Sequence, residues 1–442
     1  MMKRILTIAG SDSGGGAGIQ ADLKTITVLG GFGLSVITAL TAQNTREVQA
    51  VQGVSPGFVA QQLEAVLCDI GADAAKTGML LNAEVIEVVS DRLSAHNIKT
   101  LVVDPVMVAK SGQALLKKEA VDTLVKRLFP LALVVTPNIP EAEALTRCTI
   151  HSNNDLHDAA RAIHALGPQY VLVKGGHLKG PAKDTLYDGT RFFELVKERI
   201  DTPHTHGTGC VFSAALSTFL AQGMEMVEAV TKAKDFVHTA ICHACPLGKG
   251  HGPTNVYARF SREQERFQVL ESLKAALNRL EQASVGHLVP EVQSNLGYGL
   301  PYAQTHAHVA AFPGRLVRLG DKIVSVAGPA FGASHHIASI ILTLMRHHPA
   351  FRSVMNIRFS EDRIQRGVAL GWTVCSFDRS QEPKDVKERE GSSLEWGTQS
   401  VLSDSAAVPD VIFDRGDIGK EPMIRILGKT PDEVVDKVLQ LA

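Results

Sequence analysis

The strongest constraint on the fold is a regular alternation, over about the first 250 residues, of short apolar runs with amphipathic segments of helical spacing. The apolar runs are rich in β-branched residues and lie at residues 4–9, 34–39, 74–77, 100–104, 133–136 and 170–174. The helical segments between them lie at residues 18–29, 58–68, 83–96, 118–128, 139–146 and 154–166. Continuous apolar strands separated by helices indicate an α/β fold with a parallel sheet covered on both faces. Ligands bind such sheets at the carboxyl ends of the strands, so we expect functional residues in the loops that follow them.

The chain of 442 residues is too long for one ordinary hydrophobic core, and it predicts two domains. A glycine-rich exit at residues 249–253 precedes a charged amphipathic helix at residues 261–282, and we place the boundary there. The prediction is a first domain at residues 1–258, a connecting helix at residues 259–282 and a smaller, separate α/β domain at residues 283–442. The smaller domain has predicted helices at residues 334–346, 361–370 and 432–441 and predicted strands at residues 322–325, 353–357, 373–377 and 411–413.

Charge and cysteine content argue against several classes of partner. The 45 basic and 46 acidic residues nearly cancel, so no overall field would draw the chain to nucleic acid or to anionic lipid. The sequence has no uninterrupted apolar stretch of membrane-spanning length and no signal-peptide region, so we expect no membrane span. The six cysteines are too scattered for a disulfide framework, which favours a cytoplasmic protein. Cys242 and Cys245 form a lone C-x-x-C inside an apolar helical segment, and we assign this pair no function.

Two glycine-rich loops each precede a predicted helix. The first, at residues 10–18, follows the first strand, and its glycines would let backbone N–H groups converge on a ligand. The second contains Gly207, Thr208, Gly209 and Cys210 and opens a helix of small apolar residues. Glycines before a helix start can form an anion hole, and the residue at that start can accept a proton from a substrate hydroxyl. Either loop alone also fits a simple tight turn, but the two together favour phosphoryl transfer.

Seven motifs in this part of the chain resemble those of the hydroxymethylpyrimidine and hydroxymethylpyrimidine-phosphate kinases. They occur in the family's order and spacing across about residues 3–257, and they read AGSDSGGGAGIQAD, TAQN, AKTGML, DPVM, TPN-x-x-E, VKGGH and HGTGC. The resemblance implies a ribokinase-like α/β fold. It also implies two successive ATP-dependent phosphorylations of 4-amino-5-hydroxymethyl-2-methylpyrimidine, first to the phosphate and then to the diphosphate, with ATP and Mg²⁺ as cofactors.

Carried over by position, the resemblance assigns the chemistry of phosphoryl transfer to the second glycine loop. Cys210 is implied to be the catalytic base, where most ribokinase-like relatives have aspartate, and a helix start would stabilise its thiolate. Gly207 and Gly209 are implied to form the anion hole, and Thr208 is implied to contact ATP. Lys174 ends a predicted strand and is implied to meet nucleotide phosphate, the alternative being a solvated lysine at a strand end.

The resemblance assigns the aminopyrimidine ring to four residues of the quoted motifs. Gln43 and Asp22 are implied to read the hydrogen-bond donors and acceptors of the ring. Gly10 and Met79 are implied to close around the ring, although a core role for Met79 fits the sequence equally well.

A polar cluster at predicted strand ends is implied to orient magnesium. Asp104, Asn138 and Glu141 match the family's positions that orient the ion through water, and oxygen ligands suit this hard cation. The TPN-x-x-E motif also predicts a helix-capping box, in which Asn138 and Glu141 satisfy backbone N–H groups. The two roles are compatible.

The second domain contains two arginines that follow predicted strands. Arg358 and Arg379 each end an apolar run, where a planar guanidinium can hold phosphate. Surface arginines in salt bridges are an equally compatible interpretation. The surrounding stretches MNIRF, SFDR and DRGDIGKEPMIR resemble the thiamine-phosphate synthase domain that is often fused behind this kinase, over about residues 277–442.

This second resemblance implies condensation of the pyrimidine diphosphate with a thiazole phosphate, giving thiamine phosphate and pyrophosphate. Arg358 is implied to stabilise the leaving pyrophosphate. Three polar residues are implied to be its neighbours in the site: Asn356, Arg379 and Lys420. Asp414 and Asp417 are expected either to hold magnesium or to cap a turn.

Three alternatives remain open. The kinase could take pyridoxal, although Gln43 and the loop around Cys210 favour hydroxymethylpyrimidine. The second domain could be a non-catalytic sensor of thiamine phosphate, or a structural dimerisation module, although the presence of Arg358 favours an enzyme. We expect small-molecule substrates, no nucleic-acid or membrane partner, and a homo-oligomer.

Overall fold

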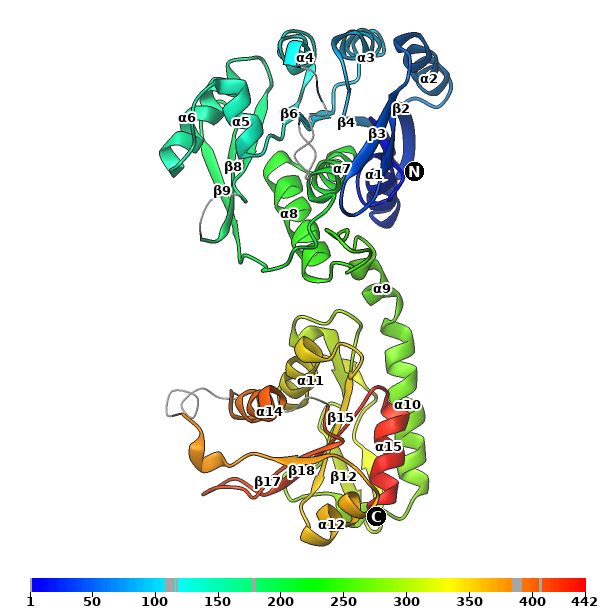
Figure 1. The fold of residues 1–442 in the computed structure, drawn as a ribbon. Coiled ribbons are helices and arrows are strands. Elements are labelled where there is room, and N and C mark those ends of the chain that lie inside the picture. Colours follow the sequence, from blue (N-terminus) through cyan, green and yellow to red (C-terminus); the bar gives the residue numbers. More distant parts are fainter. Residues whose placement is uncertain (1, 108–115, 117, 177–179, 384–391, 405–407) are drawn as a thin grey trace. The chain divides into compact units, whose positions relative to one another are not determined.

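The computed structural model describes residues 2–107, 116, 118–176, 180–383, 392–404 and 408–442. The chain forms two compact units, Met1–Arg259 and Phe260–Ala442, each with its own sheet and core (Figure 1). The helix predicted as a connector consists of α9 (Ala258–Gln264) and α10 (Arg266–Gln282). It does not act as a free connector, because the apolar face of α10 is buried in the core of the second unit. No helix among the described residues is long and apolar enough to cross a membrane.

The sheet of the first unit has nine strands in the order β3-β2-β1-β4-β5-β6-β7-β8-β9. The six central strands are parallel: β1 (Arg4–Asp12), β2 (Phe32–Gln43), β4 (Ala74–Thr77), β5 (Leu101–Val103), β6 (Val134–Val135) and β7 (Tyr170–Lys174). All six overlap the predicted apolar runs. The edge strands are antiparallel to their neighbours, so the sheet is mixed: β3 (Val48–Gly53), β8 (Ala182–Tyr187) and β9 (Phe192–Lys197). We did not predict these three strands, because they are partly exposed and interleave polar with apolar residues.

Helices cover both faces of this sheet (Figure 1). One face packs against α2 (Pro56–Asp69), α3 (Ala83–Ala95), α4 (Lys118–Thr123) with its continuation η1 (Leu124–Leu128) and η2 (Phe129–Leu131), α5 (Ile139–Thr146) and α6 (Asn153–His164). The other face packs against α1 (Gly18–Val28), α7 (Thr208–Ala221) and α8 (Met226–Cys242). Successive strand residues point to opposite faces, so Val103 joins the first of these cores and Val102 the second. Burial on both sides explains why the central strands are continuous apolar runs.

The second unit is built on a seven-stranded, mainly antiparallel sheet in the order β14-β11-β10-β15-β18-β17-β16. Its strands are β10 (Leu296–Gly299), β11 (Val309–Ala311), β14 (Ala330–Phe331), β15 (Ser353–Arg358), β16 (Val374–Ser376), β17 (Val411–Asp414) and β18 (Met423–Gly428). Beside it lie the hairpin β12 (Leu316–Leu319) and β13 (Lys322–Ser325) and the short helices η3 (Gly286–Leu288), η4 (His306–His308) and η5 (Arg379–Gln381).

Two helical layers cover this second sheet (Figure 1). One core contains α10, α15 (Pro431–Gln440) and the buried Ile364 of α12 (Glu361–Ala369). The other core contains α11 (His335–His347) and α14 (Ser392–Asp404). The unit is therefore a smaller, separate α/β body, as predicted.

Candidate functional site

The carboxyl ends of the parallel strands surround a pocket of about 730 Å³ in the first unit. Its wall comes from the ends of β1, β2 and β7, from the loops after β4, β5 and β6, and from the first turn of α7. Of the twelve residues predicted for this unit's site, eleven lie on the wall: Gly10, Gln43, Met79, Asp104, Asn138, Glu141, Lys174, Gly207, Thr208, Gly209 and Cys210. The strand-end geometry expected from the sequence therefore brings these residues together.

The twelfth predicted residue, Asp22, lies beneath the wall rather than on it. Its fully buried carboxylate accepts a hydrogen bond from the Thr7 hydroxyl (2.6 Å) and pairs with Lys76 Nζ (3.0 Å). These bonds engage the carboxylate inside the core, which corrects the expectation that Asp22 reads the substrate ring. Lys76 is also fully buried, and we assigned it no role from the sequence.

The first glycine loop is organised by an acid at its own start. Asp12, at the end of β1, accepts backbone N–H groups from Gly14 (2.8 Å), Gly16 (3.0 Å) and Ala17 (2.8 Å). Although burial opposes the shift, hydrogen bonds from His206 and from the loop backbone lower the pKa of Asp12, so this carboxylate is charged. The N–H groups that we expected to converge on a ligand are thus bound to Asp12, which corrects that expectation.

The two glycine loops lie against each other. Gly207 is the N-cap of α7 with φ of 80°, in the left-handed region that favours glycine. A Cβ at this position would lie 1.8 Å from the carbonyl oxygen of Gly16, so a larger residue would push the loops apart. A Cβ at Gly209 would lie 3.4 Å from both Asp104 Oδ2 and Lys174 Nζ. The start of α7 therefore lies directly beside this charged pair.

Asp104 and Lys174 form a mostly buried ion pair in the pocket wall. Lys174 Nζ lies 2.9 Å from Asp104 Oδ1, and the same oxygen accepts a hydrogen bond from the Thr136 hydroxyl (3.3 Å). Burial opposes protonation of Lys174, but the Asp104 and Glu141 carboxylates outweigh it and raise its pKa. Lys174 is therefore held as an ammonium on the pocket wall, paired with Asp104.

Glu141 combines a structural cap with a shifted pKa. Its backbone N–H donates to Asn138 Oδ1 (2.9 Å), and its Oε2 accepts the Asn138 N–H (2.8 Å). These bonds confirm the predicted capping box at the start of α5. Burial raises the pKa of Glu141 to about 7, with Lys174 opposing the shift and Asp104 adding to it. This carboxyl group therefore titrates near neutral pH.

Cys210 lies in the first turn of α7 as a neutral thiol. Burial raises the pKa of this thiol to about 11; Lys76 opposes the shift, whereas Asp22 and Asp104 add to it. The stabilisation of the thiolate expected from the helix start is outweighed here by burial and two neighbouring carboxylates.

Asp12 and His206 are pocket residues that sequence reasoning missed. His206 Nε2 lies 3.1 Å from Asp12 Oδ2 and 3.3 Å from Gln43 Nε2. On its other side Gln43 Oε1 accepts a hydrogen bond from the Thr41 hydroxyl (3.3 Å). The Gln43 amide thus lies between His206 and Thr41. A signal was present in the sequence, because Asp12 and His206 both belong to motifs quoted for the resemblance.

Three other wall residues have simple surroundings. A Cβ at Gly10 would lie 3.1 Å from Met79 Sδ, so the two residues pack against each other as expected for one side of a ring site. The hydroxyl of Thr208 donates to the Thr205 carbonyl (2.7 Å), which fixes the turn before α7.

In the second unit Arg379 belongs to a buried ion cluster. Its guanidinium binds Asp414 through Nε–Oδ1 (2.7 Å) and Nη2–Oδ2 (3.3 Å), and Arg425 Nη1 lies 2.8 Å from Asp414 Oδ2. Asp414 also accepts the Gly416 N–H (2.9 Å), so it caps a turn. This corrects the assignment of Arg379 to an open pyrophosphate site, because its guanidinium is used inside the core. Sequence reasoning missed Arg425, since an arginine inside an apolar strand gives no sign of its partner.

Arg358 and Asn356 both belong to β15, but their side chains have different environments. Arg358 is exposed at the strand end, and Arg363 Nη1 donates to its carbonyl (3.1 Å). Burial and the charge of Arg358 lower the pKa of Arg363. Asn356 instead accepts the Asn295 N–H (2.7 Å) and donates to the Gln293 carbonyl (3.0 Å). Its amide anchors that segment, which corrects its assignment to substrate.

Lys420 lies in the tight turn between β17 and β18. Its Nζ donates to Ser393 Oγ (3.1 Å) and lies 3.6 Å from Glu382 Oε2. Asp417 caps the same turn, since its Oδ1 accepts the Ile418 N–H (2.8 Å). Of the two roles considered for Asp417, these contacts favour the cap.

Parallel strands that end in a pocket with an aspartate–lysine pair, beside a glycine-flanked helix start, define a ribokinase-like small-molecule kinase. Similar solved structures support this assignment to the ribokinase-like kinases for the first unit. A Bacillus subtilis pyridoxal kinase in complex with ADP is 42% identical with a TM-score of 0.56, covering 59% of this chain and 99% of that one. A Staphylococcus aureus pyridoxal kinase with AMP-PCP and pyridoxal is 37% identical with a TM-score of 0.55, covering 59% and 95%.

The chain belongs to the phosphomethylpyrimidine kinase family, which matches residues 12–255. Residues 272–440 match a second family, the thiamine-phosphate synthase ThiN. Both resemblances drawn from the sequence motifs are thereby confirmed.

Named relatives match the first unit. A thiamine biosynthesis bifunctional protein ThiED from Geobacter sulfurreducens is 55% identical over 252 residues, which cover 57% of this chain and about half (51%) of that protein. A hydroxymethylpyrimidine/phosphomethylpyrimidine kinase from Haemophilus influenzae is 50% identical, covering 58% of this chain and 97% of that protein.

Proposed function

We propose that the first unit uses ATP to phosphorylate 4-amino-5-hydroxymethyl-2-methylpyrimidine and then its monophosphate. The observation that carries the proposal is the strand-end pocket, whose wall combines the Gln43 amide, the partly buried Cys210 thiol and an aspartate–lysine pair. The family match over residues 12–255 supports the same activity.

In this proposal each group on the wall has one task. The Gln43 amide, which lies beside His206, binds a ring nitrogen and the amino group of the substrate. The ionised fraction of Cys210 is a thiolate that accepts the proton of the reacting hydroxyl and becomes a neutral thiol, and the buried Lys76 ammonium favours the ionised form. Lys174 and the N–H groups at the start of α7 stabilise the charge on the transferred phosphoryl oxygens.

The proposed cofactors are ATP and Mg²⁺. The Staphylococcus aureus pyridoxal kinase contains AMP-PCP, an ATP analogue, which supports ATP as the phosphoryl donor. The carboxylates of Asp104 and Glu141 are hard oxygen donors on the pocket wall, a donor set that suits Mg²⁺ with part of its water shell. The ion would supply charge neutralisation at the phosphates.

A second candidate substrate is pyridoxal. Its support is the likeness of the first unit to two pyridoxal kinase structures, at 42% and 37% identity. The kinases of the hydroxymethylpyrimidine pathway are more similar in sequence, at 50% for Haemophilus influenzae and 47% for Bacillus subtilis. We therefore place hydroxymethylpyrimidine first and pyridoxal second.

For the second unit the proposed reaction is condensation of the pyrimidine diphosphate with thiazole phosphate, which releases pyrophosphate. The family match over residues 272–440 supports it. Arg358 is exposed at the end of β15, where Arg363 Nη1 also reaches its carbonyl, and guanidinium groups suit a diphosphate that becomes a leaving group. Arg379 and Asn356 are no longer part of this proposed site.

The cysteines support a cytoplasmic location. All six are free thiols, and Cys68, Cys148 and Cys242 are exposed. Exposed free thiols persist in a reducing compartment.

The test is to incubate the purified full chain with hydroxymethylpyrimidine, Mg-ATP and thiazole phosphate, and to follow all pyrimidine species by chromatography. We expect the monophosphate, the diphosphate and then thiamine phosphate. Cys210→Ser should stop the series at the first step, whereas Arg358→Ala should let the diphosphate accumulate.

Two results would contradict the proposal separately. Phosphorylation of pyridoxal with no turnover of hydroxymethylpyrimidine would replace the kinase substrate. Accumulation of diphosphate by the wild-type chain, with thiamine phosphate bound but never formed, would make the second unit a sensor rather than a synthase.

A further inference from the structure

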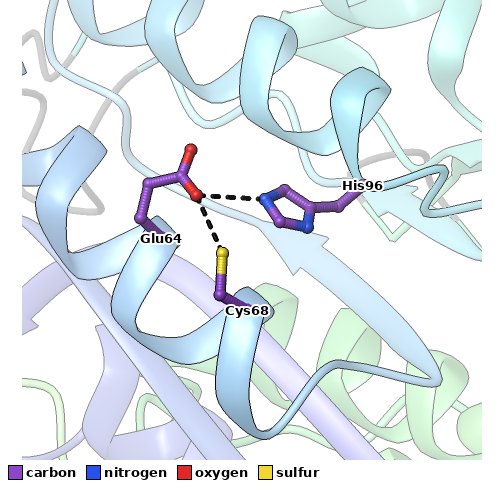
Figure 2. A group of neighbouring side chains, drawn as sticks. All are labelled: Glu64, Cys68 and His96. Atoms are coloured by element: carbon purple, nitrogen blue, oxygen red, sulfur yellow. Dashed lines mark hydrogen bonds and ion pairs between the residues drawn. The ribbon is translucent and has the colours of Figure 1, made fainter.

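A group of three possible metal ligands lies away from the kinase pocket, on the helical layer over the sheet. Glu64 and Cys68 are one helical turn apart on α2, and His96 is the C-cap of α3 (Figure 2). One ligand atom from each side chain lies within 4.8 Å of the other two. None of the three residues lines the strand-end pocket.

Cys68 and His96 both point at the same carboxylate oxygen of Glu64. Cys68 Sγ donates to Glu64 Oε2 (3.1 Å), and His96 Nε2 lies 3.3 Å from the same oxygen (Figure 2). Three ligands around a tetrahedral zinc ion stand about 3.3 to 3.6 Å from one another, as bond lengths near 2.0 to 2.3 Å require. Two of the three ligand separations are therefore close to the bound geometry before any ion is present.

A fourth residue holds the glutamate in this orientation. Arg92, on α3, lies with Nη1 3.0 Å from Glu64 Oε1, which leaves Oε2 directed at Cys68 and His96. Outer-shell partners of this kind orient carboxylate ligands in metal sites. The positive charge of Arg92 is compatible with a dication, because Glu64 and a Cys68 thiolate together supply two negative charges.

The helices that carry these ligands are firmly placed, whereas the ligands themselves are accessible. The inner faces of α2 and α3 pack into one core through Leu63, Leu67 and Leu93. The Glu64 side chain is 39% exposed and that of His96 24%, and Cys68 is exposed. An ion can therefore reach the site from solvent and keep a water molecule as its fourth ligand.

We infer that Glu64, Cys68 and His96 form a binding site for one zinc-type divalent ion, which joins α2 to α3. Thiolate, imidazole and carboxylate together select such an ion over Mg²⁺ or Ca²⁺, which prefer oxygen ligands alone. On binding, the metal–sulfur bond replaces the S–H bond of Cys68, and the proton passes to solvent.

The test uses the purified full chain, freed of metal with a chelator, and Co²⁺ as a spectroscopic probe. We expect a thiolate-to-cobalt absorption band that saturates at one ion per chain and disappears when Zn²⁺ is added. Cys68→Ser should abolish the band. His96→Gln and Glu64→Gln should weaken binding by more than the roughly 10- to 100-fold that loss of an outer-shell partner costs.

A matched control separates this site from the other thiols. Cys242 is also exposed and lies 3.7 Å from a histidine nitrogen, so Cys242→Ser removes a comparable thiol and should leave the band unchanged. Thermal unfolding without metal shows whether each variant folds, and Zn²⁺ should raise the unfolding temperature of the wild type but not of Cys68→Ser. Absence of a band in the wild type, its persistence in Cys68→Ser, or its loss in Cys242→Ser would each overturn the inference.

Discussion

The catalytic thiol proposed at Cys210 makes the kinase reaction sensitive to pH. Its pKa is raised to about 11, so at neutral pH only a small fraction is ionised, and that fraction grows about tenfold per pH unit. We expect the rate of pyrimidine phosphorylation to rise with pH between 7 and 9. Cys210→Asp should retain activity with a much flatter profile, because a carboxylate ionises at lower pH. Initial rates at fixed Mg-ATP test this, and a flat wild-type profile would exclude Cys210 as the base.

A second residue-scale prediction concerns His206, whose Nε2 lies 3.1 Å from Asp12 Oδ2 and 3.3 Å from Gln43 Nε2. Loss of one such hydrogen bond costs about 1 kcal/mol, so His206→Ala should raise KM for the aminopyrimidine about 3- to 10-fold and change kcat less. His204→Ala is the matched control, because this histidine binds the Gly252 N–H outside the pocket wall. Equal losses of kcat in both variants would assign His206 a structural role instead.

At the scale of elements, the start of α5 couples stability to function. The pKa of Glu141 is about 7 in the folded chain, above its ordinary value of 4.5. The folded state therefore holds this proton more tightly, and stability falls as pH rises from about 4.5 to 7. Glu141→Gln keeps a side-chain oxygen for the capping bond but lacks the buried charge. We expect its free energy of unfolding to exceed that of the wild type by up to about 3 kcal/mol at pH 8, and to be about equal to that of the wild type at pH 4.5.

The same substitution should reduce kinase activity about 10- to 100-fold, because Glu141 is proposed to orient Mg²⁺ through water. Thermal unfolding at the two pH values, with kinase rates on the same samples, checks both effects. A Glu141→Gln chain that is no more stable at pH 8 would mean that the carboxyl is not strained by burial.

The stability of the second unit should depend on Asp414, the buried acid at the end of β17. Asp414 is paired with Arg379 and Arg425, and all three side chains are almost fully buried. Asp414→Ala leaves two buried guanidinium groups without their partner, so we expect the second unit to lose about 3 to 5 kcal/mol of stability. Asp417→Ala, in the nearby exposed turn, should cost much less. Denaturant unfolding followed by a probe in the second unit distinguishes them, and equal costs would contradict the ion cluster.

The elements that could be predicted from the sequence are those buried on both faces. Strands β4 and β7 and helix α5 have the predicted ends, because burial on both faces, or a capping box, leaves a local signal. The edge strands β3, β8 and β9 are partly exposed and carry no such local signal in the sequence. The same limit applies to site residues. The motif positions predicted the residues of the pocket wall, but the ion-pair partners of Asp22 and Arg379 come from strands distant in sequence and were not predicted. A single sequence does not show which buried charges neutralise each other.

At the scale of the whole molecule, the two units have separate cores, so each should fold and act alone. Whether the second unit folds alone should depend on whether the expressed chain includes α10. The apolar face of α10 buries Val269, Leu273, Leu277 and Leu280 against the second sheet, and each such side chain contributes about 1.5 to 3 kcal/mol. A chain of residues 260–442 should therefore fold and, given the diphosphate and thiazole phosphate, form thiamine phosphate.

A chain of residues 283–442, cut at the predicted domain boundary, should instead aggregate, because it lacks α10 and exposes the part of the core that α10 covers. A third chain of residues 1–259, expressed by itself, should retain kinase activity. Expression, sedimentation and product analysis of the three chains compare these outcomes directly. If residues 283–442 fold as well as residues 260–442, α10 is a linker after all, and the apolar face that it buries contributes little to the stability of the second unit.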